Sequence, residues 1–307
     1  MITGMAKSFS ERLAEAVRAK KTPVMVGLDP RWELLPEVFT EGKDPSDRAS
    51  VAEAFELFCR AVIDIVAPMV PIVKPQAAFF EQYGPVGMLT LGKVIRYARS
   101  KGLLVLLDGK RNDIGSTAQA YAAGLLGEHS PWGADALTVN PYLGGDSLEP
   151  FITAAKQRAA GIFILVKTSN PGGGLFQDLI ADGKPLYRHV ADYIASLSSG
   201  LGGYGEVGAV VGATWPEQLA ELREAMPNSW LLIPGYGSQG GSAKDVAAAF
   251  DADGLGAVIN NSRGILFAHR RKEYEEYGSA RWEKAVEAAA GAMIAALAEG
   301  TRAGRLK

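Results

Sequence analysis

Short apolar segments rich in Val, Ile and Leu recur along the chain, and each ends in polar or turn-forming residues. They lack the strict alternation of a half-exposed strand, so they predict parallel strands that are buried on both faces. We expect eight such strands: Val24–Asp29, Ile72–Ala77, Leu104–Lys110, Ala136–Asn140, Ile162–Ser169, Glu206–Thr214, Trp230–Tyr236 and Ala257–Asn261.

The segments between these strands carry apolar residues at helical spacing. The pattern is clear in Ser46–Met69, Thr117–Leu126, Trp215–Ala225 and Trp282–Leu297, and weaker in Asp146–Ala159. A strand followed by a helix, repeated eight times, predicts an α/β fold of the (β/α)8 TIM barrel type, with residues 1–307 as a single domain. A doubly wound open sheet is the alternative. Eight similar units with no break in the middle favour the closed barrel.

Two of the connections are longer than one helix requires. Pro30–Pro45 follows the first expected strand, and Asn170–Pro185, which contains Pro-Gly-Gly-Gly, follows the fifth. The carboxyl ends of the strands carry the active site in barrels of this type. Inserted loops after strands 1 and 5 are therefore expected to act as lids or binding loops.

The composition narrows the class of protein. With 48% hydrophobic residues and 32 basic against 34 acidic ones, the chain resembles a soluble globular protein and has no basic excess for nucleic acid or an anionic membrane. No apolar run reaches the ~18 residues of a membrane-spanning helix, and Met1–Lys7 lacks a secretory signal. The single cysteine, Cys59, and the scattered His129, His189 and His269 disfavour a disulfide framework or a metal centre. We expect a cytoplasmic enzyme or binding protein.

Charged residues gather at the end of the third expected strand. Asp108 and Lys110 lie two positions apart, so their side chains point to the same side, and Asp113 follows in the next loop. Lys74 lies in the second expected strand, which is a neighbour in a barrel. Opposite charges ~4 Å apart attract by about 4 kcal/mol at an effective dielectric constant of ~20. A structural ion network is the simpler interpretation, but the position at strand ends favours a catalytic site.

A second group of residues indicates a phosphate site. The seventh strand runs into Pro-Gly235-Tyr-Gly-Ser-Gln-Gly-Gly, and Arg263 follows the eighth strand. Glycines let backbone N–H groups approach an anion, and arginine binds phosphate in a bidentate manner. Barrels often bind phosphate between the loops after strands seven and eight. The sequence therefore predicts a phosphorylated substrate.

Other polar residues stand at the remaining strand ends. Asp29 closes the first strand and could accept bonds from sugar hydroxyls, or could form a turn with the proline that follows. Thr168 or Ser169, after the fifth strand, could bond a polar ring edge. Ser116 and Thr117 could cap the next helix, although Thr117 could also reach a ligand.

The segment Asp108-Gly-Lys110-Arg-Asn-Asp113-Ile-Gly-Ser-Thr117 resembles the Asp-x-Lys-x-x-Asp signature of the orotidine 5′-phosphate decarboxylase family. Its form Lys-Arg-x-Asp-Ile-Gly-Ser-Thr is similar to the longer bacterial branch, often called type 2. The resemblance extends along the whole barrel, from Asp29 to Arg263. It implies a carbon–carbon lyase that converts orotidine 5′-phosphate to UMP and CO₂, the last step of de novo pyrimidine synthesis, without cofactor or metal.

The resemblance also implies catalytic roles. Lys110 would deliver the proton to C6 of the pyrimidine, Asp108 would face the substrate carboxylate, and Lys74 would link Asp108 to ribose hydroxyls. Asp113 would reach across an interface into the site of a neighbouring subunit, which implies a homodimer.

The resemblance assigns binding roles in the same way. Asp29 and Thr117 would contact the ribose, Ser169 the pyrimidine, and Arg263 the phosphate beside the Gly235 turn. Gln239 would lie near phosphate and base, although its loop differs from that of the shorter branch.

Three other functions remain open on the sequence. Barrel relatives with a similar strand act on sugar phosphates with Mg²⁺, as ketogulonate-phosphate decarboxylases and hexulose-phosphate synthases do. A Schiff-base aldolase could use Lys167 or Lys110. A non-catalytic nucleotide-binding barrel would keep only the phosphate site.

Overall fold

The strands close into a barrel. The computed structural model describes residues 7–198, 202–237 and 240–306, and within these residues eight parallel strands form a closed sheet. The first strand pairs with both the second and the last, which confirms the barrel and excludes the open sheet. In chain order the strands are β1 (Val24–Leu28), β2 (Ile72–Pro75), β3 (Leu104–Arg111), β4 (Ala136–Val139), β5 (Gly161–Lys167), β8 (Val207–Val211), β9 (Leu231–Ile233) and β10 (Ala257–Asn261).

All eight expected strands are confirmed, although most of the expected segments run beyond the observed carboxyl ends. Asp29, Gln76 and Ser169, for example, fall within expected strands but lie in the loops just after β1, β2 and β5. Gln76 still forms an isolated bridge with Asp108, whereas Asp29 and Ser169 lie beyond the ladder at the rim, where side chains can face a ligand.

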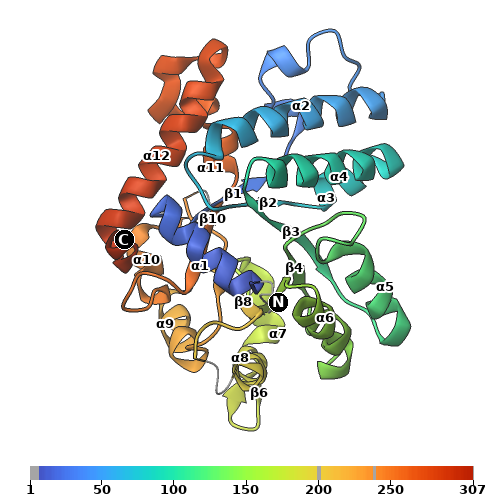
Figure 1. Ribbon diagram of the computed structural model, residues 1–307. Helices are drawn as coiled ribbons and strands as arrows, with labels where there is room; N and C mark the ends of the chain where they lie inside the picture. The colour runs from blue at the N-terminus through green and yellow to red at the C-terminus, as the bar shows by residue number, and fades with distance from the viewer. Residues whose placement is uncertain (1–6, 199–201, 238–239, 307) are drawn as a thin grey trace, which may run out of the picture.

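Helices surround the barrel in a ring (Figure 1). Five of them match the expected helical segments: α2 (Arg48–Val66), α5 (Gly115–Leu125), α6 (Gly145–Gln157), α9 (Pro216–Ala225) and α12 (Trp282–Gly300). Shorter helices lie at the rim: α3 (Ala78–Glu81), α7 (Gly174–Gln177), α10 (Ala243–Val246) and α11 (Arg263–Leu266). None of the helices in the described residues combines the length and the apolar character that a membrane-spanning segment requires.

Three further helices fall outside the helical segments named from the sequence: α1 (Phe9–Lys20), α4 (Gly84–Ser100) and α8 (Leu186–Leu197). The strand–helix repeat called for a helix after β2 and after β5, whereas α1, which precedes β1, was not expected. Glycines weaken the helical pattern of α4, because glycine is unfavourable in a helix interior. One of them is required by packing. A Cβ on Gly87 would lie 2.0 Å from the carbonyl oxygen of Phe80, which belongs to the preceding short helix α3.

Helix α1 covers the amino-terminal end of the barrel, across the front of Figure 1. Ser8 and Glu11 form a capping box at its start. Phe9 is buried against Phe163 of β5, with ring centroids 6.1 Å apart, and Arg12 pairs with Asp135, just before β4, at 2.7 Å. This end of the barrel is therefore closed, and the opposite end is left for a site.

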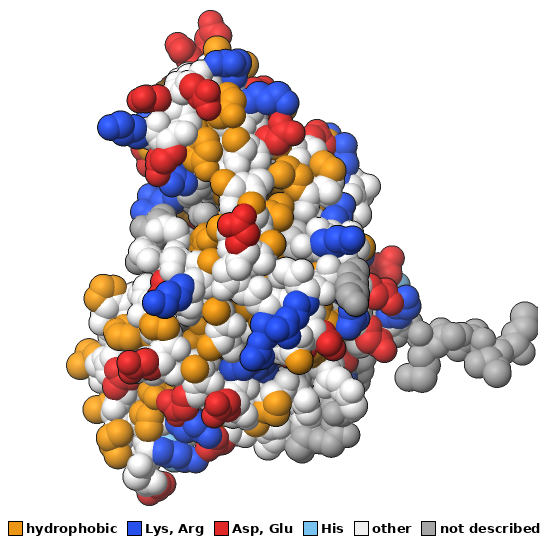
Figure 2. Space-filling view, turned by 90° about the vertical axis from the view of Figure 1, so that its left-hand side faces the viewer, with side chains coloured by type: hydrophobic (Ala, Val, Ile, Leu, Met, Phe, Trp, Pro, Cys, Tyr) orange, Lys and Arg blue, Asp and Glu red, His pale blue; other side chains and the backbone are white. Residues whose placement is uncertain are grey.

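Both long insertions follow the carboxyl ends of their strands, as expected. The first contains two short 3₁₀ turns, η1 (Trp32–Leu34) and η2 (Glu37–Phe39). The second contains the 3₁₀ turn η3 (Pro171–Gly173), α7, and an unexpected hairpin of β6 (Ile180–Ala181) and β7 (Lys184–Pro185). Its side chains Leu175, Phe176, Leu179 and Ile180 are exposed. Figure 2 shows hydrophobic side chains gathered on the lower part of the molecule, where Figure 1 places β6.

Candidate active site

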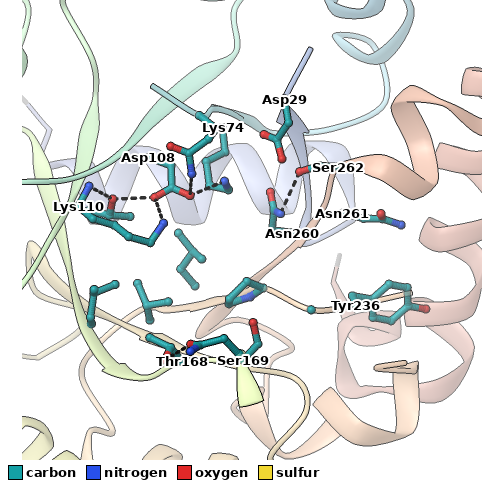
Figure 3. A pocket seen from close by; sticks show the side chains of 18 of the residues that line it. Asp29, Lys74, Asp108, Lys110, Thr168, Ser169, Tyr236, Asn260, Asn261 and Ser262 are labelled. Carbon is teal, nitrogen blue, oxygen red and sulfur yellow. Dashed lines mark hydrogen bonds and ion pairs between the residues drawn. The ribbon is translucent and has the colours of Figure 1, made fainter. Parts of the chain in front are cut away.

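A cavity of about 480 Å³ opens at the carboxyl ends of the strands. Its wall includes residues from the ends of β1, β2, β3, β4, β5, β9 and β10 (Figure 3). Seven residues expected from the sequence line it: Asp29, Lys74, Asp108, Lys110, Ser169, Gly235 and Arg263. The fold thus brings the charged cluster and the glycine-rich turn, which are more than a hundred residues apart, to one cavity.

Asp108 lies between two lysines. Its Oδ2 accepts a hydrogen bond from Nζ of Lys74 at 2.7 Å, and its Oδ1 accepts one from Nζ of Lys110 at 2.7 Å. The side chains of Asp108 and Lys74 are almost completely buried, whereas that of Lys110 is 44% exposed. Lys110 is therefore the cation of this cluster that remains accessible to a bound molecule.

Two neutral side chains complete the contacts of Asp108. The amide of Gln76 donates to Oδ2 at 3.1 Å, and the hydroxyl of Thr138 donates to Oδ1 at 2.9 Å. Neither Gln76 nor Thr138 was predicted from the sequence. Gln76 could have been found, because it lies two positions after Lys74 and thus on the same side of the chain. Thr138 is a polar residue inside an apolar strand, which is a weaker signal.

This arrangement keeps the cluster ionised. Burial opposes the charge on Asp108, but attraction and hydrogen bonds from Lys74 and Lys110 outweigh it, so the pKa of Asp108 lies well below its usual value. Burial likewise opposes the charge on Lys74, but the attraction of Asp108 and Asp29 raises its pKa above the usual value. At neutral pH the cavity therefore holds fixed positive and negative groups side by side.

The backbone of Lys110 is unusual. Its φ is 47°, in the left-handed region that residues other than glycine rarely occupy. Conformations of this kind cost about 1–3 kcal/mol and persist where the surrounding structure holds them, often at functional sites. The chain bends at Lys110, and in this conformation the ammonium group of Lys110 reaches the carboxylate of Asp108, two residues earlier.

Asp29 lies on the far side of Lys74 from Asp108 (Figure 3). Burial raises its pKa, and its Oδ1 is buried with no hydrogen-bond partner among the described residues. Asn260, at the end of β10, has an equally unpartnered buried Oδ1 within the described chain and lines the same cavity. Buried polar atoms are normally satisfied, so these oxygens are suited to accept hydrogen bonds from a bound molecule such as a sugar.

The glycine-rich turn after β9 closes the other side of the cavity. Gly235 has φ 97°, a conformation that favours glycine, and its carbonyl accepts a hydrogen bond from the N–H of Gly241 at 3.2 Å. Tyr236 and Arg263 line the cavity beside it. Gln239, expected near the phosphate, lies outside the described residues.

The second insertion returns to the cavity through Gln177, which was also not predicted from the sequence. Its Oε1 accepts the backbone N–H of Thr168 at 3.0 Å, and its amide donates to the hydroxyl of Thr168 at 2.8 Å. Thr168, Ser169 and Gln177 all line the wall. The insertion therefore forms part of the cavity.

Lys167 does not line this cavity. It is buried and paired with Asp178 of the second insertion, and its ammonium lies 4.7 Å from the ring centroid of Trp215 and 5.3 Å from that of Tyr187. A Schiff-base role for Lys167 would require the substrate to reach the outer side of the barrel wall, so the structure argues against it.

Asp113 and Thr117 also lie outside the cavity that this single chain forms. A carboxylate oxygen of Asp113 accepts the N–H of Ile114 at 2.8 Å, and Thr117 is exposed on α5. The expected capping by Ser116 or Thr117 was wrong, because Ile114 holds the cap position and makes no side-chain capping bond. Exposed apolar side chains occur in the same part of the chain as Asp113 and Thr117: Ile114 lies just before α5 and Tyr121 within it. Tyr142 and Leu143 are exposed in the loop after β4, the strand that pairs with β3.

Acidic, histidine and cysteine side chains do not form a metal site among the described residues. No group of three or more of them is arranged to hold a metal ion there.

Comparison with known proteins places these features in a family. Residues 22–277 match the model of the orotidine 5′-phosphate decarboxylase / HUMPS family. The chain is 56% identical over 290 residues to an orotidine 5′-phosphate decarboxylase of Rhodopirellula baltica, covering 92% of this chain and 96% of that protein. It is 39% identical over 283 residues to the enzyme of that name from Caldicellulosiruptor bescii, covering 88% and 93%. The solved structure of Leishmania donovani OMP decarboxylase superposes with a TM-score of 0.75 at 33% identity, covering 95% and 98% of the two chains.

Proposed function

The chain belongs to the orotidine 5′-phosphate decarboxylase / HUMPS family, and we propose that it converts orotidine 5′-phosphate to UMP and CO₂, the last step of UMP biosynthesis. The observation that carries the proposal is the buried carboxylate of Asp108, held between Lys74 and Lys110 at the rim of the barrel. The opposite wall of the same cavity carries Gly235 and Arg263, which suit a phosphate group.

The chemistry requires electrostatic help. Cleavage of the bond between C6 and its carboxylate leaves an electron pair on C6, a carbon with no adjacent electron sink. The ammonium group of Lys110 can stabilise this charge and then transfer a proton from Nζ to C6. The lysine is left neutral and regains a proton from water.

Asp108 acts in the ground state. Its pKa lies far below neutrality, so its negative charge faces the negative carboxylate of the substrate. That contact is relieved when CO₂ leaves. Lys74 keeps Asp108 charged, and its ammonium lies in the direction of Asp29, where we place the ribose hydroxyls.

The remaining binding roles follow from position. The unpartnered oxygen of Asp29 would accept from the ribose, and Ser169 would bond the pyrimidine. Backbone N–H groups of the turn at Gly235, together with Arg263, would bind the phosphate. Gln239 keeps its proposed role near phosphate and base.

We also propose that the working unit is a homodimer in the cytoplasm, with Asp113 and Thr117 completing the site of a second copy. Both residues lie outside their own chain's cavity and follow β3, the strand that carries Asp108 and Lys110: Asp113 lies in the loop after it and Thr117 near the start of α5. The exposed Ile114, Tyr142 and Leu143 supply apolar surface of the kind that interfaces cover.

The function is tested by adding purified protein to orotidine 5′-phosphate and following the near-ultraviolet absorbance of the pyrimidine. We expect the substrate absorbance to be lost at the same rate before and after exhaustive chelation, because the mechanism uses only side chains of the protein. A rate that falls on chelation and returns with Mg²⁺, or turnover of a sugar phosphate instead, would assign the chain to the metal-assisted members of the family.

A further inference from the structure

Thr138 is a buried polar side chain within β4. It is 1% exposed, lies between the apolar Leu137 and Val139, and lines the cavity beside Asp108 and Lys110. Its hydroxyl takes part in two hydrogen bonds at once. It donates to Oδ1 of Asp108 at 2.9 Å and accepts the backbone N–H of Lys110 at 2.9 Å.

The strand pairing explains why this hydroxyl is needed. Leu107 of β3 pairs with Leu137 of β4, but the next paired residue of β3 is Arg111, opposite Val139. Three residues of β3 therefore stand opposite the single residue Thr138, so the ladder is interrupted where the catalytic pair lies. Strand irregularities of this kind redirect side chains near active sites.

The side chain of Thr138 takes the place of the missing backbone partner. Within the bulge, the backbone N–H of Lys110 donates a hydrogen bond to the hydroxyl of Thr138. The φ of Lys110, 47°, is itself unfavourable. The hydroxyl of Thr138 also donates to the carboxylate of Asp108, which in turn accepts a hydrogen bond from the ammonium group of Lys110. One hydroxyl thus connects both ends of the Lys110 residue, its backbone directly and its ammonium group through Asp108.

We propose that Thr138 is a positioning residue for the decarboxylation, one that fixes the bulge of β3 so that the ammonium of Lys110 and the carboxylate of Asp108 stand where the reaction needs them. The inference rests on the proposed function. Because Thr138 donates its only hydrogen to Asp108, it has none left to donate to the substrate, and its effect passes through Asp108 and Lys110.

Thr138→Val tests the proposal, because valine keeps the shape of threonine and removes both hydrogen bonds. We expect kcat to fall about 10- to 100-fold, the loss typical of one misplaced catalytic contact, while the dissociation constant for UMP changes by less than about 3-fold. Thr138→Ser keeps the hydroxyl and should restore kcat to within about 3-fold of the wild type. Thr90→Val is the matched control, since Thr90 is a buried threonine of α4 outside the cavity, and it should behave as the wild type.

The possible outcomes separate the two proposals. A wild-type protein without decarboxylase activity would refute the proposed function and this inference with it. With an active wild type, a Thr138→Val enzyme of nearly normal kcat, or a serine variant as slow as the valine variant, would overturn the positioning role alone. If the Thr138→Val variant does not fold, Thr138→Ala is compared with Thr138→Ser instead. Alanine also lacks the hydroxyl, and its side chain is smaller than that of threonine, so it fits the same space.

Discussion

Replacement of Lys110 by alanine is expected to lower the rate of decarboxylation by at least about 10⁴-fold. General acid catalysis typically contributes about 10²–10⁴-fold and one stabilising contact to a developing charge about 10²–10³-fold, and Lys110 supplies both. UMP should still bind, because the residues assigned to phosphate and ribose are unchanged. The measurement is kcat on orotidine 5′-phosphate, together with the dissociation constant for UMP.

The barrel should remain folded in this variant. The side chain of Lys110 is 44% exposed, and Asp108 keeps its bonds to Lys74, Gln76 and Thr138. Lys101→Ala is a matched control, because Lys101 is 40% exposed and also pairs with a carboxylate, that of Asp64 at 2.6 Å. A Lys110→Ala enzyme that turns over at close to the rate of this control would refute the role of Lys110.

Mixed dimers provide the second large effect. Asp113→Ala and Lys110→Ala proteins are each expected to be nearly inactive, yet a subunit-exchanged equal mixture should recover about a quarter of the wild-type activity. Half of the dimers would be mixed, and one of the two sites in each would combine an intact Lys110 with an intact Asp113. The measurement is activity per subunit after exchange.

A control mixture shows whether the recovery comes from a shared site. Asp108→Asn mixed with Lys110→Ala should recover no activity, because Asp108 and Lys110 belong to the same chain's cavity and every site in that mixture stays defective. Absence of recovery in the Asp113 mixture, or equal recovery in both mixtures, would contradict a site completed by the second copy.

Much of this arrangement could be predicted from the sequence, because a buried strand that ends in charges leaves few choices. Lys74, Asp108 and Lys110 were expected to meet, and they do so within hydrogen-bonding distance. The phosphate side was expected from Gly235 and Arg263, and both line the same cavity.

Other parts could not be predicted for physical reasons. The bulge of β3 and the role of Thr138 depend on the pairing register, which no local pattern encodes. Gln177 reaches the cavity only because the second insertion folds back on Thr168. Helix α4 is rich in glycine and is stabilised by close packing, so its sequence pattern is weak.

The two carboxylates near Lys74, those of Asp108 and Asp29, have pKa values shifted in opposite directions by their surroundings. Asp108 has a lysine on each side and a pKa below its usual value, whereas burial raises the pKa of Asp29. The first is suited to act as a permanent negative charge. Hydrogen bonds from hydroxyl groups of a bound ribose would stabilise the ionised form of Asp29.

The most direct test is a crystal structure of the protein with UMP bound. We expect C6 of the pyrimidine beside Nζ of Lys110, the ribose hydroxyls at Asp29 and Lys74, and the phosphate between the turn at Gly235 and Arg263. A nucleotide bound away from this cavity, or electron density in which Lys74 and Lys110 point outward beneath the surrounding helices, would contradict the proposed mechanism.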